Sequence, residues 1–244
     1  ASVDTLAREI SRRMGERLDY IRIEPKRILD LGCGPGADLA AFAERYPGIP
    51  RIAVDSAPAM LTQARGEKGL FKRLMRFGKP ADPEFICADA TALPLARASV
   101  SLAWSNLMLQ WLHDPLPALK EIHRVLEVCG MLMFSTLGPD TLKELRAALP
   151  ASNAEHLHRF IDMHDLGDAL VGAGFSDPVM DMEMLTVTYA RLEDLFHDLR
   201  TSGSSNAALS RPRGLVGKDH WAALRANYEQ LRRDGRLPAT VEVV

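Results

Sequence analysis

The chain is poor in cysteine and has no strong excess of charge of either sign. Only three cysteines occur among 244 residues, and they lack the paired spacing of zinc ligands. These counts argue against a disulfide scaffold or a cysteine metal site, and we interpret the three as small buried thiols of a reducing compartment. The formal net charge of −2 argues against a general nucleic-acid-binding surface.

Long apolar runs are missing as well. No run approaches the roughly 18 residues of a membrane-spanning helix, and the opening ASVDTLAREI contains no signal-peptide core. Hydrophobic residues still make up 47% of the chain and charged residues 25%, the balance of a globular protein with a sizeable core. We therefore expect a cytoplasmic enzyme or binding protein without a membrane or nucleic-acid partner.

Strands alternate with helices in the first half of the chain. Short apolar runs predict five strands, at residues 28–31, 51–55, 84–88, 100–104 and 131–137. Amphipathic segments between them predict helices, one of which is marked at its start by Asp114 and Pro115. The alternation predicts an α/β fold of the Rossmann-like, doubly wound kind, with a mostly parallel sheet and helices on both faces. The ligand crevice of such a sheet lies outside the carboxyl ends of its strands.

The second half of the chain changes character. Helical patterns come first, followed by a strand pattern at 179–189, a second pair of helices and a last strand pattern at 237–244. We expect an adenosine-cofactor-binding core at residues 1–140 and a C-terminal part at residues 141–244. The second part is predicted to supply a helical cap over the C-terminal edge of the sheet and the final strands of the same sheet.

The stretch ILDLGCGPG at residues 28–36 joins the first strand to a glycine-rich turn. Gly32, Gly34 and Gly36 form a G-x-G-x-G pattern of the kind that cradles an adenosine cofactor. Spacing alone does not exclude a dinucleotide, because the residue after the third glycine is an alanine that can replace the last glycine of G-x-G-x-x-G. Asp55, at the end of the second strand, would serve any adenosine ribose. A purely structural glycine turn is the remaining alternative.

Polar residues without a dinucleotide counterpart narrow this choice. Asp30 lies inside the otherwise apolar first strand, where its carboxylate needs a partner, and a bound cationic amino acid would be one. Asp89, just after the third strand, is placed to accept a hydrogen bond from an exocyclic adenine amine. The fourth strand ends in SNLMLQW, which puts Asn106 and Trp111 over the crevice.

Taken together, these motifs resemble the class I S-adenosylmethionine-dependent methyltransferases over residues 27–137. Four stretches resemble one family among them, the malonyl-acyl carrier protein O-methyltransferases of biotin synthesis: SNLMLQW, FSTLGPDTLKELR, HDLGDALVGAGF and the final LPATVEV. The resemblance implies S-adenosylmethionine as the cofactor and methylation of a free malonyl carboxyl as the reaction. It also implies a segment before the first helix and a continuation of the last strand.

The resemblance further implies which residues bind the cofactor, in addition to Asp30, and it implies no metal. The set is Gly32, Cys33 and Gly34 for the methionine part; Asp55, Ser56 and Met60 for the ribose and adenosine; Asp89 and Ala90 for the adenine; and Asn106 and Leu107 for the sulfonium.

The implied chemistry needs alignment more than acid–base catalysis. A malonyl carboxylate, with a pKa of about 4, is already ionised at neutral pH, and in-line displacement from a sulfonium depends on positioning in a dry cavity. This agrees with seven scattered histidines and with the lack of a convincing Ser-His-Asp or Cys-His arrangement. Arg200 is the first candidate to hold the substrate carboxylate, with a solvated helix-end arginine as the alternative. Trp111 is a candidate wall of the thioester channel, or else a buried core aromatic.

Basic segments are candidate docking surfaces, because acyl carrier proteins are acidic. Residues 66–83 contain Lys72, Arg73 and Arg76 among apolar residues, and residues 200–236 contain eight basic residues against three acids. We predict that one or both dock malonyl-acyl carrier protein by electrostatic steering.

Two other functions stay open on the same scaffold. The chain also resembles the mitochondrial complex I assembly relative that hydroxylates arginine, which shares the DTLxELR stretch and the LPAT ending. A cofactor-binding assembly protein without turnover is the second alternative.

Overall fold

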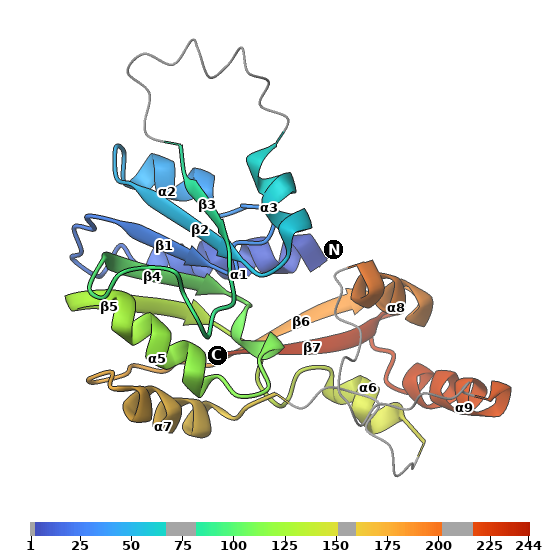
Figure 1. Cartoon of the computed structure of the whole chain (residues 1–244). Helices are drawn as coiled ribbons and strands as arrows, with labels where there is room; N and C mark the ends of the chain where they lie inside the picture. Colours follow the sequence, from blue (N-terminus) through green and yellow to red (C-terminus); the bar gives the residue numbers. More distant parts are fainter. Residues whose placement is uncertain (1–2, 67–81, 151–159, 202–216) are drawn as a thin grey trace. The chain divides into compact units, whose positions relative to one another are not determined.

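The computed structural model describes residues 3–66, 82–150, 160–201 and 217–244 (Figure 1). The chain separates into two compact units. The first comprises residues 8–136 and 164–179, and the second comprises the first seven residues with 137–163 and 180–244. No described helix is both long and apolar enough to span a membrane.

Five parallel strands form the sheet of the first unit. They are β1 (Ile28–Leu31), β2 (Arg51–Asp55), β3 (Glu84–Cys87), β4 (Val100–Asn106) and β5 (Leu126–Ser135). Their order is β3-β2-β1-β4-β5, and every neighbouring pair is parallel. The predicted parallel sheet is confirmed. The direction of winding reverses between β1 and β4, the point at which such sheets bind ligands.

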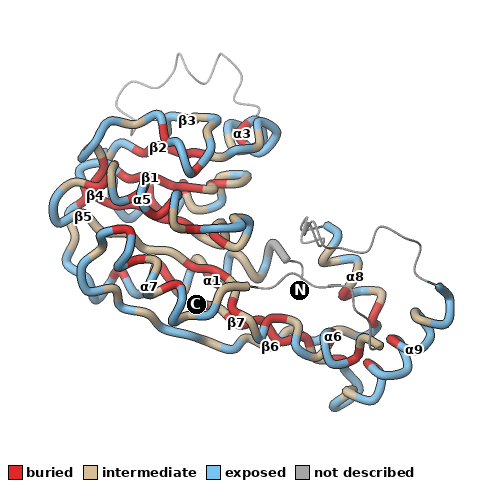
Figure 2. Tube along the Cα trace, turned by 60° about the horizontal axis from the view of Figure 1, so that its bottom comes forward, coloured by how far each residue is buried: buried red, intermediate tan, exposed pale blue. Residues whose placement is uncertain are grey.

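Apolar side chains on both faces of the central strands form the core of this unit. Ile28, Leu29 and Leu102 are fully buried, and Figure 2 shows β1 and β4 as the most continuously buried strands. Burying such a side chain contributes roughly 1.5–3 kcal/mol. The helical elements are α1 (Val3–Arg17), most of which belongs to this unit, α2 (Leu39–Arg45), α3 (Pro58–Arg65), the short turn η1 (Leu109–Trp111), α5 (Leu116–Val125) and α7 (Met163–Ala173).

Strand β5 begins earlier than the sequence pattern predicts. The pattern predicts a strand at 131–137, whereas helix α5 ends at Val125 and Leu126 already pairs with Val100 of β4. The register between the two strands shifts just after Val100, and Cys129 adopts a left-handed φ of 63°. A bulge of this kind interrupts the alternation of side chains along the strand. The sequence pattern therefore predicts only the part of β5 that follows the bulge.

Helix α7 belongs to the first unit, although the sequence pattern assigns it to the C-terminal part. Phe175, just after the helix, packs edge-to-face on His123 of α5, with 5.2 Å between ring centroids. Gly174 has a φ of 103°, and a Cβ added there would lie 3.1 Å from the same imidazole ring. The predicted division between residues 140 and 141 is therefore too simple, because the chain returns to the first unit after leaving it.

The second unit contains a sheet of its own. Strands β6 (Glu183–Tyr189) and β7 (Leu237–Val243) pair antiparallel with each other, so the prediction that they extend the main sheet is wrong. Side-chain alternation in β6 indicates a strand with one covered face but carries no information about its partner. Helices α6 (Lys143–Ala148), α8 (Leu192–Thr201) and α9 (Lys218–Glu229) complete the unit around a core that includes Tyr228 and Leu237. The helical cap stays a prediction.

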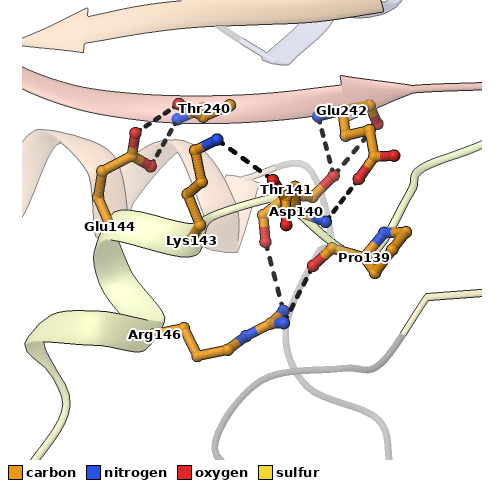
Figure 3. Close-up of polar contacts among 8 residues, drawn as sticks. All are labelled: Pro139, Asp140, Thr141, Lys143, Glu144, Arg146, Thr240 and Glu242. Atoms are coloured by element: carbon orange, nitrogen blue, oxygen red, sulfur yellow. Dashed lines mark hydrogen bonds and ion pairs between the residues drawn. The ribbon is translucent and has the colours of Figure 1, made fainter. Parts of the chain in front are cut away.

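The outer edge of β7 is closed by the segment that follows β5 (Figure 3). The Leu142 amide donates to the Thr240 carbonyl at 2.7 Å. The Thr240 amide donates to the Glu144 carboxylate at 2.9 Å. One residue pair further along, the Glu242 amide donates to the Thr141 hydroxyl at 3.1 Å. Backbone and side-chain groups of this segment thus bond the backbone groups that a third strand would otherwise take, which protects an edge strand from unwanted pairing.

This closure predicts a stability difference between two adjacent residues. Glu144→Leu should lower the free energy of unfolding by about 1–3 kcal/mol, because the amide and hydroxyl of Thr240 both lose their acceptor. Lys143→Gln removes only an exposed ion pair to Asp140 and should change it by less than about 0.5 kcal/mol. Urea unfolding followed by circular dichroism measures both, and equal losses would contradict the edge-closure interpretation.

Candidate functional site

The carboxyl ends of the parallel strands bring the predicted site residues to one edge of the main sheet. Strand β2 ends with Asp55, whose register partner on β3 is Cys87, and β4 ends with Asn106, whose partner on β5 is Ser135. The loops that follow β1, β2, β3 and β4 therefore leave the sheet side by side. This arrangement brings the ends of the strands to one edge of the sheet, and a ligand crevice at that edge stays a prediction.

The loop after β1 is a turn that only glycine accommodates readily. Gly32, Gly34 and Gly36 all have left-handed φ values, of 73°, 51° and 79°. A Cβ on Gly32 would lie 2.4 and 2.5 Å from side-chain carbons of Met108, whereas nothing lies within 4 Å of a Cβ on Gly34. The turn is thus crowded at Gly32 and open at Gly34, where a ligand can approach the backbone.

Asp55 holds this turn in place. Its Oδ2 accepts a hydrogen bond from the Gly34 amide at 2.9 Å, and its Oδ1 accepts one from the Ala57 amide at 2.8 Å. Each carboxylate oxygen keeps a second lone pair, which a ribose hydroxyl can use as an acceptor. The ribose role stays a prediction, and the structure adds a role in shaping the turn.

Asp30 is the most unusual group at this edge. Its side chain is 2% exposed, and Oδ2 has no hydrogen-bond partner among the described residues. Burial, followed by the negative charges of Asp38 and Asp55, holds the pKa of the Asp30 carboxyl well above its usual range. A cationic ligand group would supply the missing partner, so the site fits a ligand that carries an amine.

Asp38 is a site residue that the sequence reasoning missed. Its Oδ1 accepts from the Ser11 hydroxyl at 2.6 Å, and its Oδ2 accepts from Nε1 of Trp104 at 2.8 Å. It occupies the N-cap position of α2 but makes no capping bond. The available signal was Trp104 itself, since a tryptophan buried in the middle of a strand needs an acceptor for its indole N–H. Asp38 thereby joins α1, the glycine turn and β4.

Three of the five residues predicted to contact the adenosine are exposed: Ser56, Met60 and Asp89. Asp89 is exposed, and its Oδ1 accepts from both the amide and the hydroxyl of Thr91 at 2.8 Å. These two bonds lower the pKa of the Asp89 carboxyl. Ala90 is buried behind it, while Ser56 and Met60 are exposed. An ionised acceptor therefore stands at the position where an adenine amine is expected.

The end of β4 is fixed by β5. Oδ1 of Asn106 accepts from the Ser135 hydroxyl at 2.8 Å, and the Leu107 amide donates to the Ser135 hydroxyl and carbonyl oxygens, both at 3.1 Å. Leu107 has a left-handed φ of 54°. Ser135 was not among the predicted site residues, because its contact with Asn106 depends on strand pairing. Proximity of Asn106 and Leu107 to a sulfonium stays a prediction.

The residues predicted to act on the substrate are not gathered at one edge of the sheet as the cofactor residues are. Trp111 is 54% exposed, so the alternative that it is a buried core aromatic is wrong, and its channel role stays a prediction. Arg200 is exposed on α8 of the second unit. Burial raises the pKa of the Cys33 thiol to about 12, which keeps it protonated and unsuited to nucleophilic work. The predicted basic residues Lys72, Arg73 and Arg76 lie outside the described residues.

Known proteins resemble this chain in sequence and in fold. Residues 29–134 match the family described as "Methyltransferase domain". The malonyl-[acyl-carrier protein] O-methyltransferase of Gallionella capsiferriformans is 50% identical over 240 residues, covering 98% of this chain and 82% of that protein. The protein of the same name from Laribacter hongkongensis is 49% identical, covering 98% and 80%. Among solved structures, the YcgJ protein of Bacillus subtilis has a TM-score of 0.63 at 14% identity over 94% of each chain, a likeness of fold.

The different surroundings of Gly32 and Gly34 predict different effects of the same glycine-to-alanine substitution. Gly34→Ala should cost about 1–2 kcal/mol of unfolding free energy, the price of a left-handed alanine. Gly32→Ala should cost about 1–3 kcal/mol more, because the new methyl also overlaps Met108. Urea titration measures the unfolding free energy of the two variants and of the unchanged chain. A loss of unfolding free energy in Gly34→Ala as large as that in Gly32→Ala would contradict the crowding at Gly32 and the open space at Gly34.

Proposed function

The chain belongs to the malonyl-[acyl-carrier protein] O-methyltransferase family, and on that basis we propose that it transfers a methyl group in the cytoplasm from S-adenosylmethionine to the free carboxyl of malonyl-acyl carrier protein, a step of biotin synthesis. Relatives that share 40–50% of its residues carry the methyltransferase name. This favours methyl transfer over arginine hydroxylation and over a role without turnover.

The observation that carries the cofactor assignment is the buried Oδ2 of Asp30, which has no hydrogen-bond partner among the described residues, just before a turn that is open at Gly34. When bound, S-adenosylmethionine supplies a methyl group activated by a sulfonium. Asp30 would accept from its ammonium group, Asp55 from the ribose hydroxyls and Asp89 from the adenine amine. In binding the ammonium, the Asp30 carboxyl gives up the proton that burial favours in the free protein.

No group of this chain needs to act as a base in the reaction. The substrate carboxylate is ionised at neutral pH, so the protein has to align it and exclude water. The described side chains agree with this division of labour: the Cys33 thiol stays protonated, and His113 is exposed. Asn106 and Leu107, held by Ser135, offer a fixed floor at the end of β4.

One end of a helix pair in the second unit, the end that carries Arg200 and Lys218, is the candidate surface for substrate. Helices α8 and α9 contact each other in antiparallel order, through Arg225 on Glu193 at 2.7 Å and through Trp221 on Phe196 at 5.3 Å between ring centroids. Continuing this order places Arg200 and Lys218 at the same end of the pair, and both are exposed. Two neighbouring cations beside a partly exposed tryptophan suit an acidic carrier protein or the carboxylate that it delivers.

One assay tests the reaction. The protein is incubated with S-adenosylmethionine labelled in its methyl group and with malonyl-acyl carrier protein, and we expect label in a base-labile methyl ester on the carrier protein. Calorimetry on the same sample checks cofactor binding. Normal binding of S-adenosylmethionine without any ester would reject the proposed reaction.

Charge substitutions separate docking from carboxylate binding. Lys218→Glu should raise the KM for malonyl-acyl carrier protein roughly tenfold at low salt and leave the KM for malonyl-coenzyme A unchanged, because only the carrier protein needs the docking surface. Arg200→Gln should raise both KM values if the guanidinium holds the carboxylate. The triple reversal of Lys72, Arg73 and Arg76 to Glu tests the second basic segment in the same way.

High salt provides the control, since a docking effect shrinks when charges are screened. If Lys218→Glu and the triple reversal affect both substrates equally, neither segment docks the carrier protein.

A further inference from the structure

An ion pair on α5 grips the loop that follows β3. Arg124 donates from Nη1 to the Leu95 carbonyl at 2.8 Å and from Nη2 to the Leu93 carbonyl at 2.9 Å. Glu121 accepts from the Leu93 amide at 2.8 Å and is itself bonded to Nε of Arg124 at 2.7 Å. The two side chains therefore hold the main chain of the loop at three atoms.

The gripped loop carries Asp89. It leaves β3 after Cys87 and makes a tight turn, in which the Ala92 amide donates to the Asp89 carbonyl at 3.1 Å. Thr91 occupies Oδ1 of Asp89 with two hydrogen bonds, which orients the carboxylate. Among the described residues, none is seen to bond Oδ2. The turn is thus fixed by β3 at one end and by the ion pair at the other, with one carboxylate oxygen left for a ligand.

The Glu121–Arg124 ion pair makes more contacts than the stabilisation of helix α5 alone would explain. A surface ion pair three residues apart on a helix contributes little by itself. Here the side chains of Glu121 and Arg124 are only 21% and 27% exposed. The planar guanidinium of Arg124 donates hydrogen bonds both to the Glu121 carboxylate and to two carbonyls of the loop. Leu93, between those contacts, is 4% exposed and anchors the loop in the core. The contacts are directed at the loop rather than along the helix.

We propose that Glu121 and Arg124 are positioning residues for adenine recognition: by holding the backbone at Leu93 and Leu95, they set the place of the Asp89 carboxylate and hence the preference for an adenine over a hypoxanthine ring. The inference rests on the proposed function, in which Asp89 accepts from the adenine amine. It extends that function to residues on α5 that touch neither cofactor nor substrate.

The test compares two ligands that differ in the exocyclic group on C6 of the ring and in the hydrogen on the neighbouring N1. S-adenosylhomocysteine carries the exocyclic amine, whereas S-inosylhomocysteine carries a carbonyl there, which would set an acceptor against the Asp89 carboxylate. Calorimetry on the full chain should give an affinity ratio of roughly tenfold or more in favour of the adenine compound. Asp89→Asn should abolish or invert this ratio, because the amide that replaces Oδ2 donates instead of accepting.

Arg124→Met removes the guanidinium but keeps the apolar stem. We expect the ratio to fall toward one although Asp89 is unchanged, because its loop is no longer held. Lys120→Gln is the matched control, since it removes an exposed cation one turn before Arg124 whereas the bonds to Leu93 and Leu95 come from Glu121 and Arg124, and its ratio should equal that of the unchanged chain. If Arg124→Met does not fold, Glu121→Gln and Arg124→Lys are used, because each removes part of the grip while keeping a polar side chain.

The outcomes separate the inference from its premise. A lowered ratio in both Asp89→Asn and the α5 variants supports the positioning role. A lowered ratio in Asp89→Asn with an unchanged ratio in the folded α5 variants overturns it. An unchanged ratio in Asp89→Asn overturns the adenine contact and the inference with it, while the methyl-ester assay still decides the reaction.

Discussion

A buried carboxylate oxygen that finds no hydrogen-bond partner in the described part of the chain lies in the central strand of the main sheet, and the candidate site is arranged around it. Asp30 interrupts an apolar strand and is buried beside two further carboxylates, Asp38 and Asp55. Such a group destabilises the free protein unless it holds a proton. Its neighbours are nevertheless fixed by donors of their own: Asp55 by the Gly34 amide, and Asp38 by Ser11 and Trp104. The unfavourable free energy of burying an unbonded polar atom is therefore confined to Oδ2 of Asp30, the oxygen to which a cationic ligand would donate.

Backbone groups bonded by side chains recur in both units of the chain. In the first unit, Glu121 and Arg124 hold the loop after β3 by its amides and carbonyls. In the second, Thr141 and Glu144 take the place of a missing strand beside β7. Both arrangements fix irregular backbone without adding an element of secondary structure. They suit a protein whose reaction depends on alignment, because irregular segments then hold their positions as firmly as strands do.

The sequence predicted those parts of the site whose physics is local. Three glycines in alternate positions require a left-handed turn, and parallel strands bring their terminal residues to one edge, so the places of Gly34, Asp55 and Asn106 followed from the pattern. Contacts between distant segments were not predictable in this way. Asp38 meets Trp104 across 66 positions of sequence, and β6 pairs with β7 rather than with the main sheet. No local pattern distinguishes these partners from the alternatives.

Three of the four stretches that resemble the family are explained by two different physical roles. SNLMLQW ends β4, where Asn106 is fixed by Ser135 at the edge of the site. DTLKELR and LPATVEV, almost a hundred positions apart, bond to each other through Glu144 and Thr240 (Figure 3). The two stretches therefore occur together because both are needed to close the edge of β7, and neither has to contribute a catalytic group. A reaction that needs no base leaves few catalytic side chains to mark, so a methyltransferase for an already ionised carboxylate is distinguished mainly by the architecture that presents its substrate.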